Sequence, residues 1–211
     1  MKKVLKNVSF IFLLLKMCVI FGQENVKQKR ILIDVGHGGN DSGAIGLNDM
    51  KEKDVVLNVA LEVFRQNKQL EKPLDIYLSR YTDAFISLSD RTKLGKILKA
   101  DIFISMHCNH SNTPNARGIE VYVGKNLSEY SKQSTWLAFQ LQAVFKKQLG
   151  FESRGVKFAN FQVLRESIDY YPAVLLELGF LSNLDECRYF ANKQKIALIA
   201  QAILFTLKKI K

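Results

Sequence analysis

The stretch Ala173-Val174-Leu175-Leu176-Glu177-Leu178 is apolar at every position except Glu177. Continuous apolar runs of this length are typical of strands that helices cover on both faces of a sheet. Comparable runs recur along the chain and predict a sheet of about six strands. The predicted strands are residues 30–35, 74–79, 101–106, 118–123, 161–164 and 173–178.

Helical patterns alternate with these strands, because apolar residues recur there on one helical face. Gly150 is suited to end one of these helices, and Asn183 followed by Glu186 resembles a capping box at the start of another. The predicted helices are residues 54–64, 88–100, 136–149 and 196–207, with a further one after Asn183. Strands alternating with helices predict an α/β fold: a three-layer α/β/α sandwich around a mixed, largely parallel sheet.

The chain starts Met1-Lys2-Lys3 and continues with a short apolar run that Lys16 interrupts. A charged start followed by such a run predicts a signal peptide over residues 1–22 and a single domain over residues 23–211. A membrane anchor would need about 20 apolar residues, and a lipoprotein signal through Cys18 would have unsuitable residues before the cysteine. We therefore expect an exported protein of the periplasm or cell surface, with no stable membrane span after cleavage.

The chain is basic, with a formal net charge of +11. Residues 1–22 hold four of its lysines and no acidic residue, which leaves 27 basic and 20 acidic residues, a net charge of +7. This excess favours anionic surroundings such as nucleic acid, anionic lipid or a cell-wall polymer. No run of five or more Lys or Arg occurs, so nucleic-acid binding is not expected. Cys108 and Cys187 form no disulfide framework, and the sequence leaves open whether they pair.

Four side chains with metal or acid–base chemistry lie at or near the predicted carboxyl ends of strands, where α/β sheets bind ligands. His37 follows the first strand, Glu52 precedes the first helix, and His107 follows the strand 101–106. Each alone could be a turn residue, a hydrogen-bonded filler or a helix-start carboxylate. Together, two imidazoles and one carboxylate are a ligand set that leaves a position on Zn²⁺ open for water. Glu177 would supply the base, since a carboxylate in an apolar strand is costly without a partner or task.

The order of several motifs is more specific than any one residue. They are the stretches 33–39 (IDVGHGG), 51–57 (KEKDVVL), 105–109 (SMHCN), 117–120 (RGIE), 154–157 (RGVK) and 172–183 (PAVLLELGFLSN). With these motifs, the chain from about residue 30 onward resembles the zinc-dependent N-acetylmuramoyl-L-alanine amidases of peptidoglycan.

The resemblance implies a role for each candidate residue. His37, Glu52 and His107 match the family's zinc ligands, and Glu177 matches its catalytic glutamate. The implied reaction is hydrolysis of the amide between N-acetylmuramic acid and L-alanine by metal-activated water, with Glu177 as general base. The substrate partner would be peptidoglycan.

Three further residues are assigned from position. Asp34 is either support for a metal ligand or a strand-end turn carboxylate. Asn109 and Arg165 are expected to contact the substrate. Cys108 and His110 flank the metal site, but strand alternation points both away from the face of His107, so neither is expected to bind metal.

Alternatives remain at this point. Some relatives carry a long insert that blocks the zinc site until an activator withdraws it, whereas residues 124–134 are short for such a segment. We therefore expect no activator partner. An exported zinc peptidase cutting within the stem peptide, and a wall-binding protein without turnover, are the competing functions.

Overall fold

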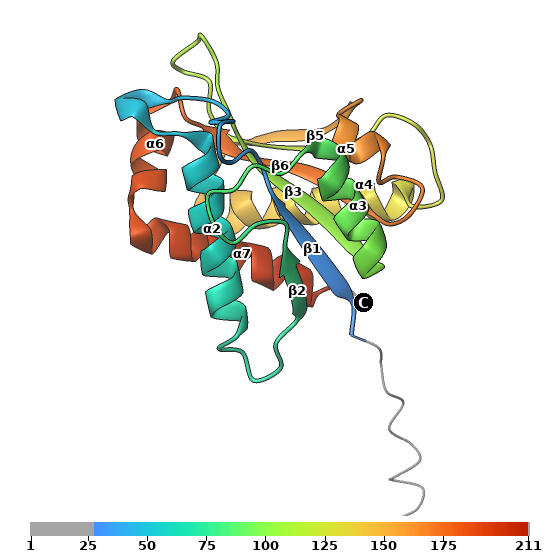
Figure 1. The fold of residues 1–211 in the computed structure, drawn as a ribbon. Helices are drawn as coiled ribbons and strands as arrows, with labels where there is room; N and C mark the ends of the chain where they lie inside the picture. The colour runs from blue at the N-terminus through green and yellow to red at the C-terminus, as the bar shows by residue number, and fades with distance from the viewer. Residues whose placement is uncertain (1–27, 211) are drawn as a thin grey trace, which may run out of the picture.

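The computed structural model describes residues 28–210, which form one six-stranded sheet with helices on both faces (Figure 1). The strand order is β2-β1-β3-β6-β4-β5, and the β4–β6 pair is antiparallel while every other pair is parallel. The strands are β1 (Arg30–Val35), β2 (Asp75–Leu78), β3 (Ile102–Asn109), β4 (Ile119–Gly124), β5 (Ser153–Ala159) and β6 (Ala173–Phe180). The predicted mixed, largely parallel sheet is confirmed.

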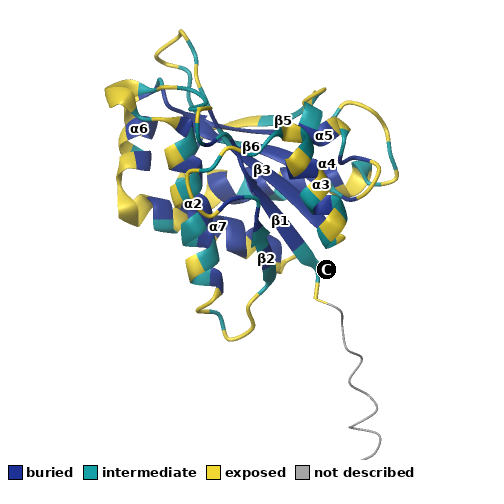
Figure 2. Ribbon diagram, viewed as in Figure 1, coloured by how far each residue is buried: buried dark blue, intermediate teal, exposed yellow. Residues whose placement is uncertain are grey.

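Helices cover both faces of this sheet, as the apolar strands require. The helical segments are η1 (Leu47–Asp49), α2 (Glu52–Asn67), α3 (Leu88–Leu98), α4 (Ser131–Val144), η2 (Phe145–Leu149), α5 (Gln162–Arg165), α6 (Leu184–Ala191) and α7 (Lys193–Lys208). Alternate residues of β1 face different layers: Ile31 and Ile33 pack with α2, α4 and α7, whereas Leu32 packs with α3 and α5. The central strands β1, β3 and β6 are largely buried between these layers (Figure 2). The three-layer α/β/α sandwich is therefore confirmed.

The prediction of a strand over residues 161–164 is wrong. Val163 and Leu164 belong to the short helix α5 and are buried against the sheet. Short apolar runs do not distinguish a strand from a buried helical turn. The sixth strand is instead β5, whose sequence SRGVKFA lacks an apolar run because it lies at the edge of the sheet.

The predicted helix ends are largely confirmed. Gly150 follows the π-helical turn η2 with a φ of 75°, as a helix-ending glycine does. The Asn183 side chain accepts hydrogen bonds from the backbone N–H groups of Asp185 and Glu186 and so caps α6. The reciprocal half of the predicted capping box is absent, because the buried Glu186 carboxylate accepts from Gly118 N and Phe180 N, each at 2.7 Å. Glu186 therefore ties α6 to the sheet.

Two other expectations concern the termini and the cysteines. The predicted signal peptide, residues 1–22, lies outside the described residues. Within residues 28–210, no helix combines the length and the apolar character needed to cross a membrane. Cys108 and Cys187 are both buried free thiols.

Candidate metal centre

The carboxyl edge of the parallel strands brings together residues from distant parts of the chain. His37 follows β1, Glu52 is the first residue of α2, and His107 lies in β3, which continues two residues beyond it to Asn109. Glu177 lies in β6 as the direct register partner of His107. The predicted convergence of these four positions at one edge is thus observed.

Three atoms converge at the centre of this edge. Glu52 Oε1 lies 3.0 Å from His37 Nε2 and 2.9 Å from His107 Nδ1. The two ring nitrogens are 3.2 Å apart. This triangle has the ligand types and the spacing of a group able to hold a metal ion.

The outer ring nitrogens of both histidines are hydrogen-bonded. His37 Nδ1 lies 2.8 Å from Asp41 Oδ2, so this N–H donates to the carboxylate. His107 Nε2 lies 3.1 Å from Ser105 Oγ. The Ser105 hydroxyl uses its one proton to donate to Asp34 Oδ2 at 2.7 Å, so it accepts from His107.

These outer hydrogen bonds decide which atoms carry lone pairs toward the centre. With their protons on the outer nitrogens, His37 Nε2 and His107 Nδ1 both direct a lone pair at a carboxylate oxygen of Glu52. Such an arrangement needs a positive charge at its centre, either a proton or a metal ion, and outer partners of this kind are usual around metal-bound imidazoles. The donor set therefore fits a zinc ion.

The electrostatics of the centre agree with this interpretation. Burial raises the pKa of Glu52, but hydrogen bonds and charge from His107 and His37 outweigh it and hold that pKa well below its usual value. Burial lowers the pKa of His37, whereas Glu52 and Asp41 raise it more strongly, so the net shift is upward. Both shifts express an attraction of the centre for positive charge.

Glycines give the centre its space. A Cβ atom on Gly43 would lie 2.5 Å from Glu52 Oε2 and 2.6 Å from His37 Cδ2, and Gly43 has a φ of +62°. A Cβ on Gly36 would lie 2.6 Å from His107 Cε1. Both contacts are too close for any side chain, so the loop after β1 can approach the ligands only with glycine at these positions.

Two buried arginines hold the same loop in place. Arg91 donates to Asp34 Oδ1 at 2.7 Å and to the His37 carbonyl at 2.7 Å. Arg80 donates to the Gly36 carbonyl at 2.9 Å. Buried guanidinium groups are stable only with such multiple acceptors, and in return they fix the backbone that carries His37.

Glu177 lies beside this centre, and no Lys or Arg of the described part of the chain forms an ion pair with it. Burial raises the pKa of Glu177 to about 7, and the neighbouring carboxylates Glu52 and Glu120 act in the same direction. Its Oε2 is buried and has no hydrogen-bond partner among the described residues. A carboxyl group with a pKa near neutrality can both take up and release a proton.

Comparison with known proteins agrees with the site. The family model for N-acetylmuramoyl-L-alanine amidase (Amidase_3) matches residues 31–209. The chain belongs to this amidase family. Its similarity extends to the sporulation-specific N-acetylmuramoyl-L-alanine amidase of Bacillus subtilis (strain 168), at 38% identity over 178 residues, with 82% of this chain and 63% of that protein covered.

Solved structures show the same fold. The catalytic domain of the amidase CwlV from Bacillus (Paenibacillus) polymyxa var. colistinus is 35% identical, with a TM-score of 0.76 over 86% of this chain and 97% of that one. The amidase from Clostridium difficile 630 is 31% identical, with a TM-score of 0.79 and 86% and 95% coverage. The chain spans 84% of the uncharacterized protein YqiI of Bacillus subtilis, with which it is 35% identical, but only 57% of the endolysin of Bacillus phage SPP1. Family membership therefore gives the enzyme class, an N-acetylmuramoyl-L-alanine amidase.

Three further positions were assigned from the sequence: Asp34, Asn109 and Arg165. Asp34 contacts His107 through Ser105, as described above. The Asn109 amide donates to Glu120 Oε2 at 3.1 Å. Arg165 is exposed at the end of α5, where it donates to the Asn160 carbonyl at 3.0 Å. Their contact with substrate stays a prediction.

The two neighbours of His107 are placed as predicted, outside the ligand cluster. The Cys108 side chain is buried among apolar residues, while its backbone N–H donates to Glu52 Oε1 at 2.9 Å. His110 is exposed beyond the end of β3.

Sequence reasoning missed the roles of Asp41 and Ser105. Their signals were present, since Asp41 follows His37 by four residues within the glycine-rich loop and Ser105 precedes His107 by two, on the same strand face.

Proposed function

We propose that this protein is a zinc-dependent amidase that hydrolyses the bond between N-acetylmuramic acid and L-alanine of peptidoglycan stem peptides. The observation that carries the proposal is the convergence of His37 Nε2, Glu52 Oε1 and His107 Nδ1, at 2.9 to 3.2 Å from one another, beside Glu177. Family membership supplies the enzyme class, and this geometry supports the proposed mechanism.

In this mechanism His37, Glu52 and His107 would hold the ion. When bound, zinc lowers the pKa of a coordinated water from about 15.7 toward about 7 and polarises a carbonyl oxygen. Glu177 removes the proton from the attacking water and then delivers it to the departing nitrogen of L-alanine. Glu177 must be ionised in the first step and protonated in the second, and its burial, which raises its pKa, favours the second.

The surrounding residues keep the ligands in the protonation state that the ion needs. Asp41 holds the proton of His37 on Nδ1, and Ser105, backed by Asp34, holds that of His107 on Nε2. Arg91 fixes Asp34 and the His37 backbone together. These residues act through the ligands, so we expect them to affect metal affinity first.

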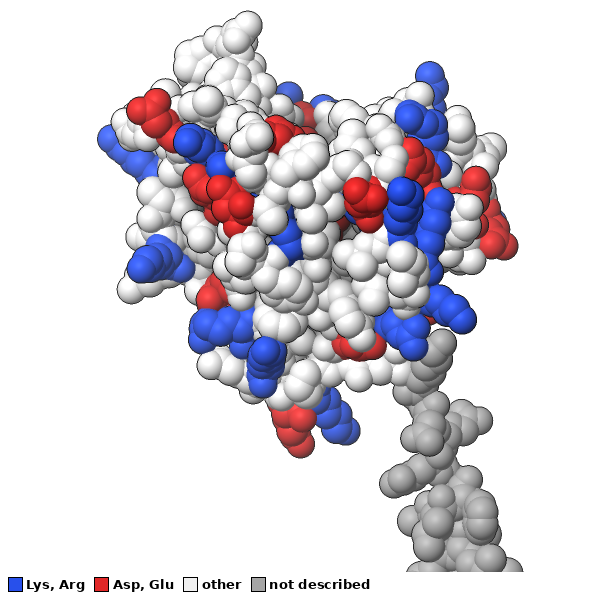
Figure 3. All heavy atoms as spheres, in the orientation of Figure 1, with Lys and Arg blue, Asp and Glu red and all other residues white. Residues whose placement is uncertain are grey.

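The proposal also covers the location of the enzyme and its binding partners. We propose an exported protein acting on peptidoglycan, with residues 1–22 as signal peptide, and relatives named probable cell wall amidases support the export. Lys/Arg and Asp/Glu are interspersed on the face shown in Figure 3, and the absence of a nucleic-acid partner stays a prediction. Only residues 125–130 connect β4 to α4, so we propose activity without an activator.

Digestion of intact sacculi by the purified protein tests these statements. Mass analysis of the released fragments should find peptides with a free L-alanine amine and muramic acid with an unsubstituted lactyl group. A chelator should abolish the release, and added Zn²⁺ should restore it. A peptidase acting within the stem peptide would instead leave L-alanine on the muramic acid. Full activity of a metal-free preparation would refute the proposed mechanism.

A further inference from the structure

The motif Arg154-Gly155-Val156-Lys157 lies in the edge strand β5 and is not part of the metal centre. In a regular strand, residues three positions apart point to opposite faces. Here the pairing of β4 with β5 shifts its register opposite Glu120, and Gly155 has a φ of +87°. Arg154 Nε and Lys157 Nζ therefore reach the same atom, Glu120 Oε1, at 2.6 and 2.7 Å. Bulges of this kind redirect side chains beside active sites.

Glu120 holds this cation pair, and both of its carboxylate oxygens already accept hydrogen bonds. Its carboxylate is 3% exposed. Its second oxygen, Oε2, accepts from Tyr122 OH at 2.7 Å and from Asn109 Nδ2 at 3.1 Å. With both oxygens occupied, Glu120 is unsuited to proton transfer. One carboxylate against two cations leaves one positive charge in excess at this position.

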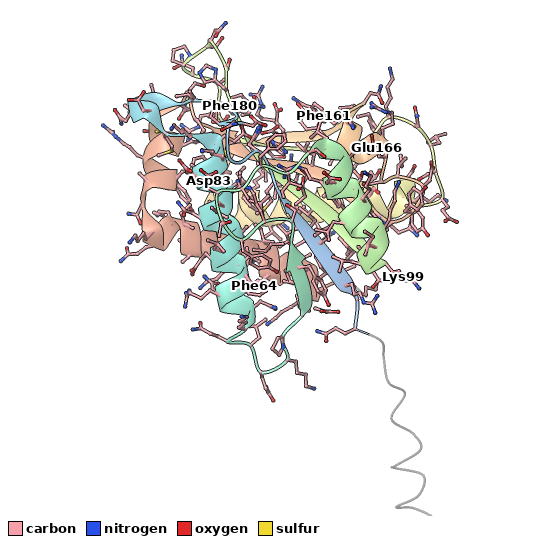
Figure 4. The ribbon with its side chains drawn as sticks, in the orientation of Figure 1. Phe64, Asp83, Lys99, Phe161, Glu166 and Phe180 are labelled. Carbon is pink, nitrogen blue, oxygen red and sulfur yellow. The ribbon has the colours of Figure 1, made fainter. Side chains whose placement is uncertain are left out.

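The cation pair is accessible and has unused donors. The Arg154 and Lys157 side chains are 39% and 37% exposed. Among the described residues, Lys157 Nζ makes one hydrogen bond and Arg154 Nη2 makes none. The Arg154 guanidinium lies 5.1 Å from the ring centroid of Phe180, and the ring of Tyr122 lies 5.2 Å from that of Phe161. Lys157 Nζ lies 5.7 Å from the ring centroid of Tyr122, so aromatic rings flank the cation pair. Phe180 and Phe161 are labelled in Figure 4.

The strand order shows on which side of Glu177 the cation pair lies. β3, β6, β4 and β5 are neighbours, and they carry His107, Glu177, Glu120 and the cation pair in that order. At about 4.8 Å per strand, the cation pair lies roughly 5 to 10 Å from Glu177, on the side away from the metal ligands.

We propose that Arg154 and Lys157 form a subsite for a carboxylate of the departing peptide, with Glu120 as the residue that positions them. The inference rests on the proposed function, in which the scissile carbonyl lies at the metal centre and the leaving nitrogen lies at Glu177. The peptide then continues across β4 toward β5. At about 3.3 to 3.6 Å per residue, a span of 5 to 10 Å corresponds to the second residue of the stem peptide. That residue is a γ-linked D-glutamate, whose α-carboxyl group is either free or amidated.

Two matched substrates test this subsite in the full-length enzyme. They are muropeptides that differ only in a free carboxylate or a carboxamide on the second residue, and kcat/KM is measured for each. The test variants are Arg154→Met and Lys157→Met, which keep an unbranched apolar side chain. Lys157→Arg keeps the charge, and Lys147→Gln removes an exposed lysine of η2 as the control for net charge.

We expect the wild type to prefer the carboxylate substrate roughly 10-fold, mainly through KM, as a charge-assisted hydrogen bond at a half-exposed site allows. This preference should fall below about twofold in both Met variants and persist in Lys157→Arg and Lys147→Gln. No preference in the wild type, or an unchanged preference in Met variants that keep the wild-type Tm, would overturn the inference. If Arg154→Met does not fold, Lys157→Met decides alone.

A binding measurement separates this inference from the proposed function. Calorimetry with the inactive Glu177→Gln variant measures affinity for the dipeptide of L-alanine and D-glutamate whose γ-carboxyl group is blocked as a methylamide, with the α-carboxyl group either free or amidated. A roughly 10-fold tighter binding of the free carboxylate, lost on adding Lys157→Met, supports the subsite even if the wild type fails to cleave peptidoglycan. Equal binding of the two dipeptides contradicts the subsite even if amidase activity is present.

Discussion

We expect the substitution Glu177→Gln to increase the free energy of unfolding at a pH above about 7, because it removes a carboxylate that has no compensating charge. Burial raises the pKa of Glu177 from 4.5 to about 7 in the folded, zinc-free protein. Between these values the folded protein retains a proton that the unfolded chain has released, so the free energy of unfolding falls as the pH rises through this window. At 1.36 kcal/mol per pKa unit, the shift amounts to about 3 kcal/mol. Glutamine cannot ionise, so Glu177→Gln should lack this loss.

Urea unfolding of the zinc-free proteins at pH 4 and pH 8 measures this difference. We expect the wild type and Glu177→Gln to be similar at pH 4, and the variant to be more stable at pH 8 by up to about 3 kcal/mol. Glu71→Gln, at an exposed position between α2 and β2, controls for the loss of one carboxylate. The same pH dependence in Glu177→Gln and the wild type would refute the reasoning.

The variant Glu177→Gln should also lose amidase activity while it still binds zinc. We expect kcat to fall by about 10² to 10⁴, the usual contribution of a general base, with unchanged zinc content. Turnover near that of the wild type would remove Glu177 from the mechanism.

Further predictions concern the centre and the thiols. Gly43→Ala places a Cβ atom 2.5 Å from Glu52 Oε2, so we expect a large loss of zinc affinity in chelator competition; wild-type affinity would show that the loop can yield. Ser105→Ala leaves His107 Nε2 without its acceptor and should weaken zinc binding about 10- to 100-fold, whereas an equal affinity would deny Ser105 a positioning role. Zinc at 100 times its Kd should stabilise the folded protein by about 2.7 kcal/mol, seen as a higher Tm that a chelator reverses. Burial raises the pKa of Cys108 and Cys187, so both thiols should react with a thiol reagent only after denaturation; rapid reaction of the native protein would contradict their burial.

The sequence predicted the central strands well because their environment is simple. β6 is covered on both faces, so nearly every residue is apolar, and the exception, Glu177, becomes conspicuous. The edge strand β5 was missed for the opposite reason. It is paired on one side only and half exposed, so its polar residues resemble a loop, while the buried helix α5 supplied an apolar run that resembled a strand.

In the candidate site, too, the sequence predicted some residues and missed others. His37, Glu52, His107 and Glu177 were predicted because their residue types are chemically distinctive and a family resemblance orders them. The outer partners were not, since Asp41 and Ser105 are common polar residues whose role depends on the direction of a hydrogen bond. The shared contact of Arg154 and Lys157 was also hidden, because a spacing of three predicts opposite strand faces until a bulge is known.

These contacts together explain why Glu177, of three neighbouring carboxylates, is the one with a pKa suited to proton transfer. Glu52, on one side, is compensated by the two imidazoles of the metal centre. Glu120, on the other side, is compensated by Arg154 and Lys157, and its pKa is lowered although burial acts against this. Glu177 lies between them, half-buried and with no Lys or Arg paired to it within residues 28–210, and both neighbours raise its pKa. The compensation of its neighbours is what lets a single unpaired carboxylate exist there at a tolerable cost, since three uncompensated charges could not share one edge of the sheet.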